Sequence, residues 1–328
     1  MKWFCIFAFF ISLLHSYSIV FVHIGAELPT YLYTAIDQAR LFNPEGTIYL
    51  IANKEALRKS SSMLDQMGKD FLRQVSCETL IRSKSHHLFR KQSTLDKKSY
   101  EGLWTFASER FFYLEELIQQ YDLKDIFHLE NDVMLYRDLS VLLPVFKTHY
   151  SNKIAVTFDN ENRCIPGFLY VSQHQPISKL VKFMAAEAKA GKTDMEILPA
   201  FKAKYGDGYI DALPIVTPEY CRDHILKNHL GATAKNPHQF FRNFDDFQSI
   251  FDAAAIGQYL GGISPRNGAA IPGFINESCL FDPSKFQYVW KEDPRGRWAP
   301  FILYKEVAYP INNLHIHSKN LVSFFSKR

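Results

Sequence analysis

The chain has 328 residues and a mass of 38.0 kDa, and its 38 lysines and arginines against 34 aspartates and glutamates give a formal net charge of +4. Hydrophobic residues make up 47% and charged residues 22%, which is typical of folded globular proteins and excludes long disordered tracts, collagen-like repeats and a multi-span membrane protein. The small net charge gives no reason to expect nucleic acid as a partner.

An apolar run near the N-terminus predicts a signal peptide or short anchor over residues 1–18. Lys2 precedes the run 3–14, which is shorter than the about 20 residues that a membrane-spanning helix needs. Ser16 and Ser18 supply the small side chains of a cleavage site. An uncleaved anchor that continues into the next residues is the alternative. We therefore expect a secretory route or membrane association through this segment, facing the cytoplasm if the source is bacterial.

The chain then alternates between strand and helix. An apolar strand is predicted over 19–24, a helix over 29–42 and a second strand over 47–52. Short connections of this kind indicate a βαβ crossover with two parallel strands. Because ligands collect at the carboxyl ends of such strands, His23 and Gly25 are candidate cofactor-binding residues.

The pattern is weaker up to residue 100. A polar helix is expected over 55–66, and a basic stretch over 82–98 is expected to be a solvated loop, with a patch for anionic substrates or membrane head groups as the alternative. Apolar residues then recur at spacings of three and four from Trp104 to Tyr121, which predicts a helix that contributes to the core.

The rest of the chain continues the alternation. Strands are predicted at 125–136, 154–158, 167–171 and 213–216, and helices at 177–190, 195–204, 218–227 and 251–260. This order predicts the α/β class: one domain over 19–321 with a mixed, mainly parallel central sheet flanked by helices, a loop-rich C-terminal third and a tail over 322–328.

Glu130-Asn131-Asp132 is the most specific chemical signal in the sequence. Residues i and i+2 of an extended chain point to one side, and two carboxylates held that closely are costly unless a cation lies between them. Hard oxygen ligands suit Mn²⁺ or Mg²⁺ holding a diphosphate. The alternative is a pair of exposed acids that cap a helix beginning near Leu139.

An apolar strand followed by acid-x-Asp resembles the DxD element of GT-A-fold glycosyltransferases, and the βαβ unit over 19–52 is similar to the nucleotide-binding half of that fold. The resemblance covers residues 19–321 at the level of element order. It implies a single GT-A-like (Rossmann-like) domain in which a divalent metal binds a nucleotide sugar. Glu130 stands where the family usually has aspartate, so Asp132 is expected to be the firmer ligand.

His315-Ile316-His317 lies near the C-terminus, and two histidines at i and i+2 on a strand can ligate a metal from one face. The resemblance to glycogenin-like enzymes implies that a C-terminal histidine completes the metal site and that a nearby lysine contacts the diphosphate. We therefore expect His317 as a ligand, His315 as its alternative and Lys319 as a diphosphate partner. The alternative is that both histidines lie on the surface and bind no metal.

Further cofactor contacts are expected from two helices. The resemblance places Asp252 and Gln258 beside the donor sugar, although Asp252 is equally consistent with a helix N-cap. Arg110 interrupts an otherwise apolar helix, where it is expected to form a salt bridge with Glu115 or Asp132, with a donor phosphate as the alternative partner.

The acceptor site is predicted in residues 288–298, where aromatic and charged residues share a segment that contains proline and glycine. If the reaction inverts the anomeric centre, a carboxylate must deprotonate the acceptor hydroxyl. Asp252, Glu277 and Asp293 are the candidate catalytic bases.

These features predict a metal-dependent glycosyltransferase that moves a sugar from a nucleoside diphosphate sugar to a carbohydrate, glycoprotein or glycolipid acceptor. A uridine diphosphate sugar is the expected donor. The alternatives are a secreted carbohydrate-binding module or pseudoenzyme with the same fold, and a metal-dependent phosphoesterase that acts on nucleotide sugars.

Overall fold

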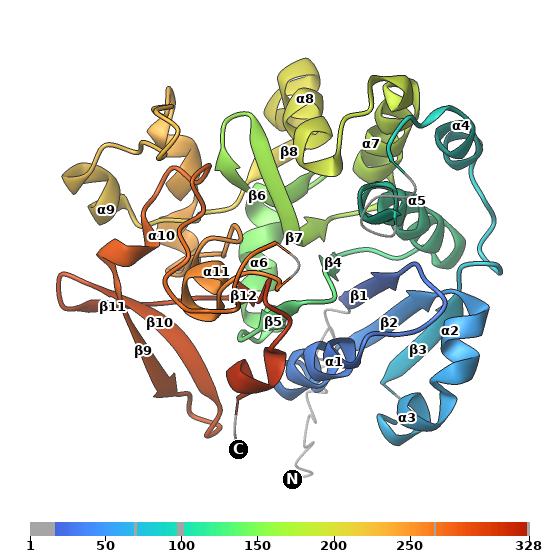
Figure 1. Cartoon of the computed structure of the whole chain (residues 1–328), viewed down its shortest axis with the longest axis horizontal. Coiled ribbons are helices and arrows are strands. Elements are labelled where there is room, and N and C mark those ends of the chain that lie inside the picture. Colours follow the sequence, from blue (N-terminus) through green and yellow to red (C-terminus); the bar gives the residue numbers. More distant parts are fainter. Residues whose placement is uncertain (1–16, 69–70, 97–101, 266, 327–328) are drawn as a thin grey trace, which may run out of the picture.

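The computed structural model describes residues 17–68, 71–96, 102–265 and 267–326 (Figure 1). A seven-stranded sheet crosses the molecule in the order β3-β2-β1-β4-β7-β6-β8. Its strands are β1 (Ser18–His23), β2 (Thr47–Ala52), β3 (Leu72–Ser76), β4 (Ile126–Leu129), β6 (Ile154–Asn160), β7 (Arg163–Val171) and β8 (Ile210–Ala212). β7 is antiparallel to both β4 and β6, while the remaining neighbours are parallel. The predicted α/β class with a mixed, mainly parallel sheet is confirmed.

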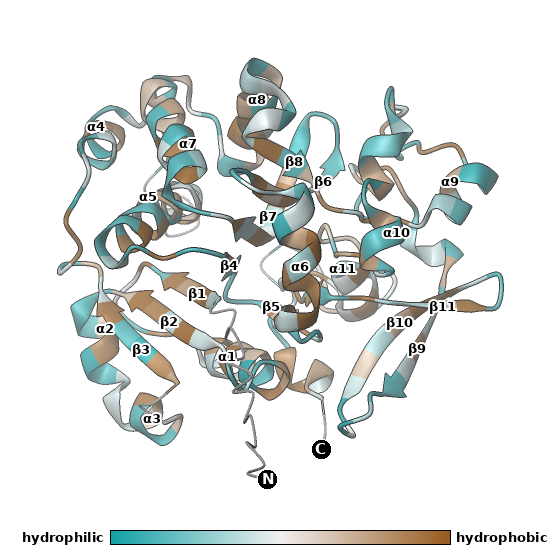
Figure 2. Ribbon diagram, turned by 180° about the vertical axis from the view of Figure 1, so that it is seen from behind, coloured by the Kyte–Doolittle hydropathy of each residue, from teal (hydrophilic) through white to brown (hydrophobic). Residues whose placement is uncertain are grey.

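Helices flank this sheet. They are α1 (Thr30–Phe42), α2 (Lys54–Lys59), α3 (Ser61–Gln66), α4 (Lys84–Gln92), α5 (Leu103–Tyr121), α6 (Leu139–His149), α7 (His174–Ala186), α8 (Asp194–Tyr205), α9 (Pro218–Asp223), α10 (Phe244–Phe247) and α11 (Ile256–Gly261). α5 packs on β1 and α8 packs on β7. Because β1, β2 and β4 are buried along almost their whole length, they read as continuous apolar runs, as Figure 2 shows for β1 and β2.

The long core helix predicted from Trp104 to Tyr121 is confirmed by α5. The polar helix expected over 55–66 is two short helices, α2 and α3, which meet at Ser60. The basic stretch expected to be a loop instead contains α4, because the Ser83 hydroxyl accepts a hydrogen bond from the His86 N–H at 3.2 Å and caps the helix. The part of the basic stretch at 97–98 lies outside the described residues.

The predicted strand over 125–136 is divided into β4 and β5 (Val133–Leu135) by a turn that contains the acidic motif. The last strand of the main sheet, β8, ends at Ala212, just before the strand expected over 213–216. Both differences between prediction and structure are small in sequence. The division into β4 and β5 nevertheless decides where the acidic side chains project.

The C-terminal third contains more strand than expected. β9 (Gln287–Glu292), β10 (Trp298–Tyr304) and β11 (Val307–Pro310) form an antiparallel sheet, and β12 (Asn313–His315) pairs with β5. The predicted acceptor loop over 288–298 is therefore mostly a β-hairpin. The expected tail also has packed residues, since the Ser326 N–H donates to Gln38 in α1 at 3.0 Å.

The predicted targeting segment lies outside the described residues up to residue 16. Ser18 is the first residue of β1, and the buried Tyr17 donates a hydrogen bond to the Asn43 side chain at 2.9 Å, so both residues contribute to the fold. In the described part of the chain, no helix combines the length and apolar character needed to cross a membrane. The expectation of a secretory or membrane-associated chain is therefore corrected: no signal or anchor is seen in that part.

Candidate metal and diphosphate site

The acidic motif occupies the turn between β4 and β5. The Val133 N–H donates to the Glu130 carbonyl at 3.1 Å and closes this turn, while the Glu130 N–H still donates to Gly167 of β7 at 2.9 Å. Glu130 and Asp132 consequently lie at the carboxyl edge of the parallel strands, which is where open α/β sheets bind ligands.

β12 brings the C-terminal histidine to the same turn. It pairs antiparallel with β5 so that His315 lies opposite Val133, and the Ile316 N–H donates to the Asp132 carbonyl at 2.9 Å. This short strand pair explains how Asp132 and His315, which are 183 positions apart, come into contact.

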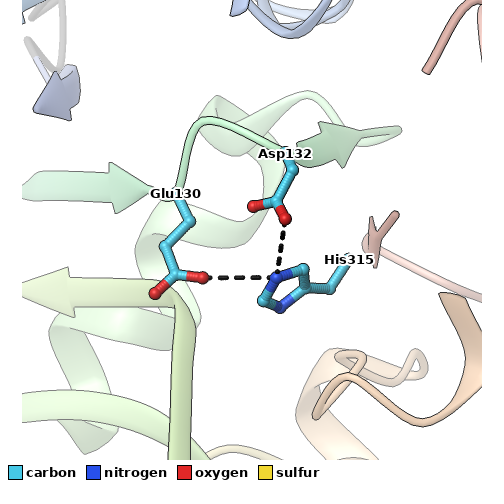
Figure 3. A group of neighbouring side chains, drawn as sticks. All are labelled: Glu130, Asp132 and His315. Carbon is cyan, nitrogen blue, oxygen red and sulfur yellow. Dashed lines mark hydrogen bonds and ion pairs between the residues drawn. The ribbon is translucent and has the colours of Figure 1, made fainter. Parts of the chain in front are cut away.

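Glu130, Asp132 and His315 converge around one point (Figure 3). Nε2 of His315 lies 3.2 Å from Oδ2 of Asp132 and 3.3 Å from Oε2 of Glu130. One ligand atom from each residue lies within 4.8 Å of the others, so the three could share a metal ion. Asp132 and His315 are buried and Glu130 is partly buried.

His317, the expected ligand, does not join this group, and the alternative His315 takes its place. β12 ends at His315, and the His317 N–H turns back to the His315 carbonyl at 3.0 Å, so the two-residue alternation of a strand stops there. Nδ1 of His317 instead accepts a hydrogen bond from the Ser264 N–H at 3.1 Å. Burial and the charges of His315 and Lys319 lower the pKa of His317 to about 4.

Two cationic side chains flank the acids. The Lys319 ammonium forms an ion pair with Asp132. The Arg110 guanidinium forms an ion pair with Glu130 and a second one with Asp194, whose Oδ2 lies 2.9 Å from Nη2 of Arg110. The salt bridge expected for Arg110 is therefore present, but with different partners from Glu115 and Asp132.

The charges control protonation in this cluster. Burial would lower the pKa of His315, but the carboxylates of Asp132 and Glu130 raise it to about 9. Burial would raise the pKa of both acids, yet Arg110 and His315 keep that of Glu130 below its usual value, and His315 and Lys319 keep that of Asp132 well below its own. Both acids are thus carboxylates at neutral pH, as metal ligands must be.

Other polar residues lie at the adjoining end of β1. Nδ1 of His23 is 3.2 Å from the side-chain amide of Asn131, and the Gly25 N–H donates to Asn53 at 2.8 Å. Nε2 of His23 and Oδ1 of Asn131 are buried without a hydrogen-bond partner among the described residues. The structure therefore places His23 and Gly25 next to the acidic turn.

Asp252 is buried, and its carboxylate is engaged in hydrogen bonds to the backbone. Its carboxylate accepts hydrogen bonds from four backbone N–H groups, three at the start of α11 and one from His315. Burial raises its pKa despite these bonds. Both oxygens of this carboxylate are occupied by backbone N–H groups, so the observed contacts give Asp252 a structural role, and its assignment as a catalytic base stays a prediction.

Asp293 lies away from the site. It occupies the turn of the β9–β10 hairpin, where its carboxylate bonds to Arg297, and that guanidinium also donates to the Leu41 carbonyl at 3.0 Å. Leu41 is at the C-terminal end of α1, about 17 Å along the helix from its start beside the carboxyl edge of β1. The structure does not bring Asp293 into the cluster of Glu130, Asp132 and His315, and its assignment as the base stays a prediction.

Glu277 and Gln258 complete the predicted set. Glu277 is exposed on the segment after α11, and Gln258 lies on α11, where its carbonyl accepts a hydrogen bond from the Gly262 N–H at 2.8 Å. In the described ranges, no hydrogen bond or ion pair joins either side chain to Glu130, Asp132 or His315. The structure does not bring these two residues into the cluster.

The alternative assignment of the acids as helix caps is wrong, because Asp138 caps α6 by accepting from the Ser140 N–H at 3.0 Å. Two residues of the site escaped the sequence prediction. Asp194 could be recognised as the first residue of a capped helix, but its pairing with Arg110 depends on the packing of α8 beside α5. Asn53 carries no motif, and only the strand order places it beside Gly25.

Comparisons with known proteins give fold likenesses alone. No protein-family model matches the sequence, and no curated protein matches it. Among solved structures, mouse xyloside xylosyltransferase 1 in its apo form is similar with 11% identity and a TM-score of 0.43, over 64% of this chain and 90% of that one.

Two further glycosyltransferase structures give comparable values. The galactosyltransferase LgtC in complex with donor and acceptor sugar analogues has 13% identity and a TM-score of 0.42, over 63% of this chain and 77% of that one. The glycosyltransferase GlyE of Streptococcus pneumoniae TIGR4 has 14% identity and a TM-score of 0.41, over 63% and 49%. The chain thus resembles glycosyltransferase structures in its fold, but likenesses at this level assign neither a family nor an activity.

Proposed function

We propose that the protein is a glycosyltransferase that uses a nucleoside diphosphate sugar and a divalent metal ion. The observation that carries the proposal is the convergence of Glu130, Asp132 and His315 at the carboxyl edge of the sheet (Figure 3). Two carboxylates and an imidazole form a donor set that suits Mn²⁺, with its tolerance for both oxygen and nitrogen ligands.

A further observation, on the surroundings of His315, also indicates that these three residues fit a metal ion. Nδ1 of His315 is buried without a partner among the described residues, and a Cβ at Gly167 would lie 2.7 Å from it. The ring is thus held closely from behind while Nε2 points at the two carboxylates. We assign Glu130, Asp132 and His315 as the residues that would hold the ion.

The neighbouring cations suit a diphosphate. A bound divalent cation supplies a Lewis acid that neutralises charge on the leaving diphosphate. Lys319 is partly exposed and its ammonium can donate to a phosphate oxygen while it remains close to Asp132. Arg110 is buried between Glu130 and Asp194, so its role is to orient Glu130 rather than to bind phosphate.

We place the nucleoside over the carboxyl ends of β1 and β2. His23 and Asn131 have buried polar atoms there without a hydrogen-bond partner in the described part of the chain, and Asn53 already binds the backbone of Gly25. Unpaired buried polar atoms are costly, and hydrogen bonds to a ligand would satisfy them. A uridine diphosphate sugar as donor and a carbohydrate-containing acceptor complete the proposal.

The first experiment is a turnover assay of the purified protein with Mn²⁺, a panel of nucleotide sugars and mixed carbohydrate acceptors. We expect release of nucleoside diphosphate from at least one donor. Asp132→Asn, which removes a ligand charge without changing the side-chain size, should lower the rate on the order of 100-fold or more. The matched control is Asp246→Asn, an exposed aspartate paired with His149, which should retain the wild-type rate.

Two results would reject this function. Release of nucleoside monophosphate and sugar 1-phosphate in place of nucleoside diphosphate would indicate a phosphoesterase that hydrolyses the diphosphate bridge. If no donor is consumed and Asp132→Asn binds every sugar ligand as the wild type does, the chain would be a binding module on the same fold.

A further inference from the structure

The Asp252 carboxylate joins the start of α11 to the backbone of His315. Oδ1 accepts hydrogen bonds from the N–H groups of Ala255 and Ile256 at 2.8 and 2.9 Å. Oδ2 accepts from Gly257 at 2.8 Å and from His315 at 2.9 Å. One buried oxygen is therefore shared by the helix and the residue whose ring completes the proposed metal site.

Close backbone contacts hold the same residue from two other sides. A Cβ at Gly257 would lie 2.2 Å from the carbonyl oxygen of His315, and a Cβ at Gly167 would lie 2.7 Å from its Nδ1. Both positions accordingly need glycine. Asp252 and Gly257 fix the His315 main chain, and Gly167 fixes the depth of its ring against β7.

The contact between His315 and the acids depends on this support. His315 is the last residue of β12; on its C-terminal side the Ile316 N–H still donates to the Asp132 carbonyl at 2.9 Å, and the chain then turns at His317. Nε2 lies at 3.2 Å from Asp132 and 3.3 Å from Glu130, and a displacement of the ring by a fraction of an ångström would weaken simultaneous ligation with them.

We propose that Asp252 and Gly167 are positioning residues that hold His315 as a nitrogen ligand of the metal ion. Asp252 thereby has a role in the site that differs from the catalytic base predicted from sequence, because it acts through the His315 backbone. The inference rests on the metal-binding part of the proposed function and is independent of the sugar that is transferred.

The test measures Mn²⁺ binding by electron paramagnetic resonance, with the modulation from a directly bound ¹⁴N nucleus as the signature of His315. In the wild type we expect this nitrogen signal, and in His315→Ala its loss. Asp252→Asn replaces one carboxylate oxygen, which accepts from two N–H groups, by an NH₂ group, which cannot accept from them. The substitution should weaken Mn²⁺ binding about 10- to 100-fold and reduce the nitrogen signal. Asp138→Asn, a matched change at the cap of α6, should alter neither.

Gly167→Ala provides a second route in case Asp252→Asn does not fold. Its added methyl group would lie 2.7 Å from Nδ1 of His315 and 3.3 Å from Cγ2 of Val133, and it leaves the hydrogen bonds of Asp252 intact. The nitrogen signal should therefore fall while the circular dichroism spectrum is unchanged.

A full nitrogen signal and wild-type Mn²⁺ affinity in Gly167→Ala, or in folded Asp252→Asn, would overturn the inference. A wild-type protein that binds no Mn²⁺, or binds it without the nitrogen signal, would also overturn it. A protein that shows the expected signals but transfers no sugar would reject the proposed function and leave this inference standing.

Discussion

A protonated His315 and a divalent cation compete for the same two carboxylates. The ring is held by Asp132 at 3.2 Å and Glu130 at 3.3 Å, and these acids raise its pKa to about 9 against the effect of burial. A metal ion can bind Nε2 only after the proton has left. The same acids therefore attract the metal and oppose it through the proton that they stabilise.

We expect Mn²⁺ affinity to increase with pH, about tenfold per unit below pH 9, and to level off above it, because one proton is released on binding. His315→Ala should remove this slope. His317→Ala should keep it, since His317 has a pKa of about 4 and is already neutral in this range. The check is Mn²⁺ titration calorimetry between pH 6 and pH 9.5. A flat profile in the wild type, or a slope that disappears with His317→Ala, would contradict the assignment of His315.

At the residue scale, the sequence could locate the acids but not their histidine. Glu130 and Asp132 are neighbours after an apolar strand, and that local pattern is sufficient to predict a polar strand end. The choice between His315 and His317 depends on where β12 stops, which is decided by its pairing with β5 rather than by local composition. The possible helix-cap role of Asp252 anticipates its three hydrogen bonds at the start of α11, but its hydrogen bond from the His315 N–H is not visible in the sequence.

At the scale of elements, a buried histidine joins α4 to α5. Nδ1 of His86 lies 2.8 Å from Glu116 and Nε2 lies 2.9 Å from Glu109, and all three side chains are almost fully buried. Burial opposes protonation of His86, but its hydrogen bonds to the two glutamates raise the pKa above the usual value. The stabilisation is therefore complete at pH values below about 6.5 and is lost as the pH rises through the pKa of the folded state.

His86→Leu should lower the free energy of unfolding by about 3–5 kcal/mol at pH 6, because it leaves the buried Glu116 carboxylate without its cation and leaves Glu109 with Arg90 at 3.5 Å. The deficit relative to the wild type should shrink toward pH 9, as the pH rises through the raised pKa of folded His86 and the ring loses its charge. Urea denaturation at the two pH values measures both effects. The control His149→Leu removes a more exposed pair with Asp246 and should cost no more than about 1 kcal/mol. Equal losses for the two variants, or a deficit that grows with pH, would refute this account of α4.

The elements differ in how well sequence predicts them. α5 follows a regular apolar spacing over many residues and is found where expected. The sequence does not predict α4, because charged residues dominate the composition of this segment. The helix begins at the Ser83 cap, and few of its residues are buried. β9 lies in the predicted loop over 288–298, since this half-exposed strand lacks a continuous apolar run.

At the scale of the whole molecule, the alternation of strands and helices is enough to predict the α/β class but not the order of the strands. β7 runs antiparallel between β4 and β6, and this arrangement places Gly167 behind the His315 ring. The site depends on the main sheet, which presents the acids, and on the β5–β12 pair, which supplies the histidine (Figure 1). Contacts between segments so distant in sequence follow from packing, and no local motif specifies them.

The central claim is that Glu130, Asp132 and His315 hold a divalent ion which in turn binds a nucleoside diphosphate. Titration calorimetry with uridine diphosphate, carried out with Mn²⁺ and with a chelator in its place, tests this claim most directly. We predict binding in the presence of Mn²⁺, little or none with the chelator, and strongly reduced binding by Asp132→Asn with Mn²⁺. Equal affinity with and without the metal, or wild-type affinity in Asp132→Asn, would contradict the claim.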